Sequence, residues 1–159
     1  LSCQMPGMSA TRTVWLHTAS ERQRMVNPRK AYPVDPGLIP VYERAGRENL
    51  GRALETAVLL ELERRGCEVG YVRTDEGYEV DFHARDPEGH VYLIQVSADV
   101  ANEETWQREV RALASAASAY PDATPVLLTA DTQPPAEALP APLVWQPACA
   151  WLLGDQIPT

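Results

Sequence analysis

The stretch from Gly77 to Ser97 concentrates polar residues that could bind a metal ion. Its pattern predicts a β-hairpin, with Asp81 on the first strand and Gln95 on the second. Side chains alternate faces along a strand, so Asp81 and Gln95 can share a face if the two strands pair side by side. Their oxygen atoms would then converge on one point, as the ligands of Mg²⁺ or Mn²⁺ do.

The same alternation places two more titratable residues of the first strand beside Asp81. Glu79 could act as a supporting acid, although a solvated strand residue explains it equally well. A base role is conceivable for His83, but a lone histidine on a strand is more often structural or exposed. We expect Val80 and Phe82 to point together to the opposite face.

The longest helix is expected over residues 47–65, closed by Gly66 as its C-cap glycine. Its apolar residues form a broad stripe, and Glu55 projects into that stripe. A carboxylate in this position needs a partner, because burying an unpaired charge is costly. A salt bridge to arginine, an exposed rim position and a metal site remain alternatives.

The hairpin belongs to a longer series of strands and helices. We expect α/β architecture, a mixed sheet flanked by helices in the order helix, three-strand meander, helix, strand. The second helix should connect parallel strands. The strands are expected at 11–16, 67–73, 78–85, 90–97, 125–129 and 143–145, with the second helix at 103–119 and a helical turn at 148–153.

The composition is that of a globular domain with an acidic surface. The chain has 159 residues, 45% of them hydrophobic, and a formal net charge of −8. This charge disfavours non-specific nucleic-acid binding without excluding a locally basic groove, because phosphate contacts need clustered basic side chains. Lys30 is the only lysine, and no glycine-rich phosphate loop precedes it, so the chain carries no P-loop ATPase engine.

The three cysteines are widely separated, which argues against a zinc site or a disulfide framework. The sequence has no long apolar run and no signal-peptide pattern, so we expect a soluble cytoplasmic protein with no membrane partner. Because the chain begins with Leu, a fragment of a longer protein is an open alternative. We expect residues 1–26 to be a disordered lead or the end of a preceding domain or linker, 27–153 the main domain, and 154–159 a tail.

Several ordered stretches resemble the PD-(D/E)xK nuclease-like domain found at the C-terminus of prokaryotic AAA+ type ATPases. The resemblance implies a restriction-endonuclease-like fold, in which strand carboxylates hold Mg²⁺ and a lysine helps to activate the attacking water. It also implies DNA or an ATPase domain, in the same or another polypeptide, as partner. The matching stretches are Asn27–Tyr32, Asp35–Leu38, Gly51–Glu55, Gly77–Phe82, Ile94–Ser97, Thr105–Glu109 and Trp151–Leu153.

Carried over by position, Glu55 matches the first-helix acid, Asp81 the central metal ligand, Gln95 the second acid and Ser97 the lysine. The resemblance therefore implies Glu55, Asp81, Gln95 and the carbonyl of Val96 as metal ligands. Gln95 lacks the negative charge of an acid, which predicts weaker Mg²⁺ binding. Ser97 cannot supply a cation at all.

Two residues could replace the missing lysine, Lys30 upstream and Arg108 on the second helix. Arginine positions phosphate well but stays protonated, so Arg108 could help only electrostatically. A solvated or interdomain ion-pair face is the simpler interpretation of Arg108 and Glu109. Two functions follow: a divergent Mg²⁺-dependent DNA phosphodiesterase, or a catalytically inactive nuclease-fold module that binds or regulates an ATPase partner.

Overall fold

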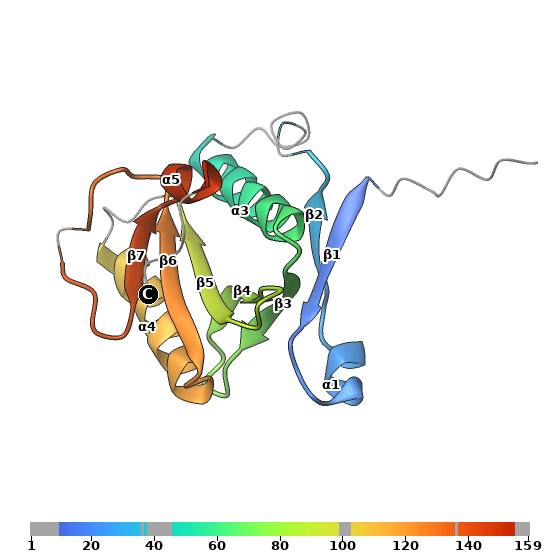
Figure 1. The fold of residues 1–159 in the computed structure, drawn as a ribbon. Helices are drawn as coiled ribbons and strands as arrows, with labels where there is room; N and C mark the ends of the chain where they lie inside the picture. The colour runs from blue at the N-terminus through green and yellow to red at the C-terminus, as the bar shows by residue number, and fades with distance from the viewer. Residues whose placement is uncertain (1–9, 36, 38–45, 99–102, 136, 155–159) are drawn as a thin grey trace, which may run out of the picture.

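A computed structural model describes residues 10–35, 37, 46–98, 103–135 and 137–154. Within these residues, seven strands form one mixed sheet in the order β2-β1-β3-β4-β5-β6-β7, with helices on both faces (Figure 1). This confirms the predicted α/β class. The elements, in chain order, are β1 (Thr11–Leu16), α1 (Glu21–Val26), β2 (Lys30–Pro33), α3 (Gly46–Arg64), β3 (Glu68–Arg73), β4 (Glu79–Arg85), β5 (Val91–Ser97), α4 (Glu103–Ala119), β6 (Ala123–Thr129), β7 (Val144–Pro147) and α5 (Ala148–Leu152).

The central elements follow the order predicted from the sequence. Helix α3 ends before Gly66, whose φ of 77° is the left-handed conformation expected of a C-cap glycine. Strands β3, β4 and β5 pair antiparallel, and Gly89, with φ 95°, lies in the turn between the last two. Helix α4 then crosses to β6, which pairs parallel with β5 as predicted.

The N-terminal segment joins the same sheet. Strand β1 pairs antiparallel with β2 and parallel with β3, the latter through Trp15 and Leu16. The polar stretch interpreted as a linker or the end of a preceding domain contains α1, and Ser20 caps this helix by accepting a hydrogen bond from the Gln23 amide. The sheet therefore extends across the domain boundary suggested at residue 27. The first nine residues of the expected lead and residues 155–159 of the expected tail lie outside the described part.

The two faces of the sheet are covered by different helices (Figure 1). Helices α3 and α5 pack on one face, where Leu59, Phe82 and Trp151 belong to one buried cluster. Helix α4 packs on the other face, where Leu93 and Leu113 belong to a second cluster. Because both faces of β5 and β6 are buried, the sequences of these strands are nearly continuous runs of apolar residues.

Strand β4 does not keep the simple alternation expected from its sequence. Its pairing with β3 shifts register by one residue, so that Asp81 and Phe82 together oppose Tyr71. Val80 consequently packs in the cluster under α4, whereas Phe82 packs in the cluster under α3. The prediction that Val80 and Phe82 share a face is therefore wrong, and a β-bulge is the reason.

No helix of the described residues is both long enough and apolar enough to cross a lipid bilayer.

Candidate functional site

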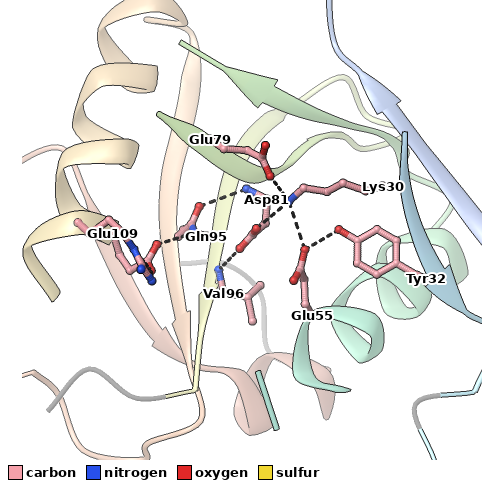
Figure 2. Close-up of polar contacts among 9 residues, drawn as sticks. Lys30, Tyr32, Glu55, Glu79, Asp81, Gln95, Val96 and Glu109 are labelled. Atoms are coloured by element: carbon pink, nitrogen blue, oxygen red, sulfur yellow. Dashed lines mark hydrogen bonds and ion pairs between the residues drawn. The ribbon is translucent and has the colours of Figure 1, made fainter. Parts of the chain in front are cut away.

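The ammonium group of Lys30 lies at the centre of a cluster of carboxylates (Figure 2). Its Nζ atom is 2.9 Å from Asp81 Oδ1, 3.3 Å from Glu55 Oε1 and 2.9 Å from Glu79 Oε1. The side chains of Lys30, Glu55 and Asp81 are 20%, 21% and 13% exposed, so water screens these contacts only in part. Three acidic groups thus share one cation.

Three separate elements bring this cluster together. Lys30 begins β2, Glu55 comes from α3, and Glu79 and Asp81 come from β4. β2 reaches the others through its partner β1, which pairs with β3, and Lys30 Nζ also lies 5.7 Å from the centre of the Tyr71 ring on β3. The site thus depends on the antiparallel pair formed by β1 and β2.

The charges in the cluster alter the acidity of its members. Burial alone would lower the pKa of Lys30, but the carboxylates of Asp81 and Glu55 outweigh burial and raise that pKa above its usual value. Burial and the neighbouring charge of Glu55 raise the pKa of Asp81 to about 7, against the opposing effect of Lys30. Lys30 therefore stays protonated, and the carboxyl group of Asp81 is a weaker acid than usual.

Tyr32 fixes the position of Glu55. Its hydroxyl donates a hydrogen bond of 2.5 Å to Glu55 Oε1, the same oxygen that contacts Lys30. Lys30 and Tyr32 are two positions apart on β2 and so reach the same side. Burial, reinforced by the Glu55 charge, raises the pKa of Tyr32, so its hydroxyl remains a donor. Sequence reasoning missed Tyr32, although its spacing from the only lysine was a usable signal.

Asp81 and Gln95 are neighbours, but each binds the other strand's backbone. The residue pairing of β4 with β5 ends at Phe82 and Ile94. Beyond that pair, the Asp81 amide donates to Gln95 Oε1 at 3.2 Å, and the Val96 amide donates to Asp81 Oδ2 at 3.0 Å (Figure 2). The two side chains thereby continue the hydrogen bonding of the sheet.

The other end of the Gln95 amide faces α4. Its Nε2 atom donates to Glu109 Oε2 at 2.6 Å, and the other Glu109 oxygen accepts from Arg108 at 2.6 Å. Glu109 forms the ion pair with Arg108 that the sequence suggested, but at 5% exposure it is not part of a solvated face. The Arg108 side chain, at 69% exposure, does lie at the surface. Hydrogen bonds thus connect Arg108 to the cluster through Glu109 and Gln95, and its charge also interacts with Asp81.

Ser97 and His83, two further residues considered from the sequence, are buried at other positions in the sheet. Ser97 is buried at the end of β5, opposite Thr129 of β6 in the parallel register. His83 is buried and its ring stacks on His17 of the segment after β1, with ring centroids 3.6 Å apart. The structural alternative for His83 is therefore confirmed, since its ring packs on another ring and not in the acidic cluster.

Two of the predicted metal ligands fit a hard divalent cation. The carboxylates of Glu55 and Asp81 already meet on one positive charge, that of Lys30, and Mg²⁺ can be held by one or two carboxylates with water. Gln95 fits less well, because its oxygen accepts from the Asp81 amide. Among the described side chains, no three His, Cys, Asp or Glu residues are grouped so as to hold a metal ion.

Comparison of the chain with known protein families, curated protein sequences and solved structures found no match. Function therefore has to be inferred from the geometry of the site itself.

Proposed function

We propose that this chain is a divergent PD-(D/E)xK nuclease-like domain that hydrolyses DNA phosphodiester bonds with Mg²⁺ or Mn²⁺. The main supporting observation is the position of Lys30, whose Nζ lies 2.9 Å from Asp81 and 3.3 Å from Glu55. Ser97 stands where the resemblance calls for a lysine. Lys30 supplies a cation beside the same aspartate from a different strand.

The order of elements also supports this proposal. An acid-bearing helix, α3, precedes the three-strand meander, and α4 and β6 follow it. Glu55 and Asp81 meet across these elements, as the resemblance to the nuclease-like domain implies. A fold alone does not define a reaction, so the proposal rests on the grouping of side chains.

Each residue of the cluster has a chemical role in this proposal. Glu55 and Asp81 would hold the divalent cation, which when bound would polarise a phosphoryl oxygen and acidify water. Lys30 reduces the negative charge that a DNA phosphate would otherwise meet. Tyr32 orients Glu55 through its hydrogen bond, and Gln95 holds the backbone of Asp81 in place.

A second candidate is a catalytically inactive module that binds an ATPase partner. One observation favours it: both oxygens of Asp81 and both ends of the Gln95 amide have partners inside the protein. Such a satisfied network can serve the fold alone. The net charge of −8 also makes broad DNA binding unfavourable.

Cleavage assays separate the two candidates. Labelled single-stranded, duplex and branched DNA would be incubated with the protein and Mg²⁺, Mn²⁺ or a chelator. We expect metal-dependent cleavage that falls by about 10²-fold or more in Asp81→Asn and in Lys30→Met, the usual effect of removing an electrostatic catalytic group. Arg111→Met, on the surface of α4 and outside the cluster, is the matched control and should cleave like the wild type.

Asp81→Asn keeps oxygen and nitrogen atoms in place of the carboxylate, and thermal unfolding would confirm that it folds. Calorimetric titration with Mn²⁺ provides a readout independent of turnover. If the wild type cleaves no DNA above the Asp81→Asn background and binds no Mn²⁺, the nuclease proposal is wrong and the inactive module is favoured.

A further inference from the structure

A cavity lies at the opposite end of the central strands from the Lys30 cluster. Its volume is about 890 Å³, within the range of sites for small organic ligands. It is lined by the end of β1, the start of β3, the end of β4, α1 and the turn after α4. These segments lie toward the lower end of the view in Figure 1, whereas α3 lies at the top. None of the lining residues belongs to the cluster.

A stack of aromatic rings forms one side of this cavity. The exposed ring of His17 lies on the buried ring of His83, nearly parallel at 11°. Tyr120 meets the His83 ring edge-on, with the ring centroids 5.5 Å apart. Burial and two nearby arginines lower the pKa of His17, which keeps this ring neutral at pH 7. The stack is therefore an aromatic surface that is exposed to solvent at His17.

The stack exists because β3 has a glycine between the two histidines. Gly70 is the register partner of His83 on one side and of Trp15 on the other. A Cβ atom at position 70 would lie 3.1 Å from the His17 Cβ. The absence of a side chain thus lets the two rings meet across the intervening strand.

Two arginines lie beside this surface, and one of them, Arg85, is the register partner of Glu68 on β3. Arg24 and Arg85 line the cavity, and both are close enough to His17 to lower its pKa. Both are exposed, and neither forms a salt bridge within the described residues. Both guanidinium groups can donate hydrogen bonds to an anion in the cavity, where two carboxylates of the lining offset their charge. Glu68 and Asp122 also line it and can accept hydrogen bonds from hydroxyl or amino groups.

We propose that this cavity binds a nucleoside monophosphate, either free or at the end of a nucleic-acid strand. The base would extend the His17–His83 stack, as bases do on aromatic side chains. Arg24 and Arg85 would hold the phosphate, and Glu68 or Asp122 would accept from the sugar or base. A simple anion would not use the ring surface, and an uncharged ring would not use the arginines. This inference does not rest on the nuclease proposal.

A fluorescence titration of the full 159-residue chain tests whether the cavity binds a nucleoside monophosphate. Trp15 lines the cavity, so its fluorescence can report binding of AMP, CMP, adenosine or inorganic phosphate. We expect AMP to bind with a Kd below about 1 mM, and adenosine and phosphate to bind at least about tenfold more weakly. Arg85→Ala and Arg24→Ala should each weaken AMP binding about tenfold. Arg111→Ala, on the surface of α4, should leave it unchanged.

Two further titrations, one with an oligonucleotide and one with a variant of the Lys30 cluster, complete the experiment. A short oligoadenylate with a 5′ phosphate that binds more tightly than AMP would assign the cavity to a strand end, and weaker binding would assign it to free nucleotides. Asp81→Asn should bind AMP like the wild type, which keeps this test separate from the cleavage assay. Absence of saturable AMP binding, or AMP affinity that survives Arg85→Ala and Arg24→Ala unchanged, would overturn the proposal.

Discussion

Glu55 illustrates how one partly buried charge organises its neighbours. Its position in the apolar stripe of α3 required a partner, as predicted, but the partners are Lys30 and Tyr32 and not an arginine. Both come from β2, 25 and 23 residues before Glu55 in the sequence. The need for a partner was a local property of the helix, whereas the identity of the partner was decided by strand pairing.

The Tyr32 hydroxyl should contribute measurably to stability. Tyr32→Phe removes the donor to Glu55 and leaves a partly buried carboxylate with fewer hydrogen bonds. We expect the free energy of unfolding to fall by about 1–2 kcal/mol, as measured by urea denaturation. Tyr78→Phe, a partly buried tyrosine outside the cluster, is the matched control. Equal losses in the two variants would contradict this role.

At the scale of elements, Glu61 links α3 to α5. Its carboxylate accepts from Arg64 and Arg65, and Arg65 also donates to the backbone carbonyl of Trp151 at 2.5 Å. The Arg65 guanidinium lies 4.2 Å from the centre of the Trp151 ring. One acidic side chain therefore orients the arginine that fastens the last helix to the core.

This arrangement predicts a loss of stability in acid. Hydrogen bonds from Arg64 and Arg65 lower the pKa of Glu61 from 4.5 to about 2, and the Arg64 bond has the largest effect. Burial alone would raise this pKa, but the arginines outweigh it. Because the folded state prefers the ionised form, its contribution is complete above pH 4.5 and is lost as the pH falls toward 2. Glu61→Gln should cost about 1–2 kcal/mol at neutral pH, a value reduced because Arg64 is exposed, and should flatten the acid limb of the stability curve.

Thermal unfolding measured across this pH range would check the effect. Glu63→Gln is the control on the same helix, because the ion pair of Glu63 with Arg12 lies at the surface. That variant should change stability by less than about 1 kcal/mol. An acid limb that is identical in Glu61→Gln and the wild type would refute the assignment.

Two glycines should respond in opposite ways to the same added methyl group. Gly70→Ala would place a Cβ atom 3.2 Å from the Trp15 carbonyl oxygen and push β1 away from β3, at a cost of about 1–3 kcal/mol. Gly51→Ala, inside α3, would place a Cβ atom 3.8 Å from Ala98 and within 4 Å of no other described residue, so it should stabilise the protein by up to about 1 kcal/mol. Urea denaturation of both variants would measure the contrast, and equal shifts would contradict the close approach of β1 to β3.

At the scale of the whole molecule, the sequence predicted what local patterns determine. The β3–β4–β5 meander, α4 and the parallel β5–β6 pair followed from periodicity and from turn residues such as Gly89. The arrangement of the N-terminal segment could not be predicted in this way, because β1 enters the sheet between β2 and β3. Its place depends on pairing between segments that are distant in the sequence.

In the candidate site, too, local patterns predicted some contacts, whereas others depend on pairing between distant segments. Asp81 and Gln95 were predicted to be neighbours from the hairpin alone, and they are in contact. The bulge at Asp81 and Phe82 could not be predicted, because it is a property of the register between β4 and β3, in which both residues oppose Tyr71. The position of Lys30 also remained open until the sheet order placed β2 within reach of β4.

The hydrogen bonds of Asp81 have a consequence for how such sites change over time. Because Val96 donates to its carboxylate, Asp81 closes the end of the β4–β5 ladder as well as facing Lys30. A descendant that no longer needed chemistry here would still lose sheet structure if it replaced this aspartate. Selection for folding alone can therefore preserve an acidic residue that looks catalytic, and its presence in a sequence is no measure of activity.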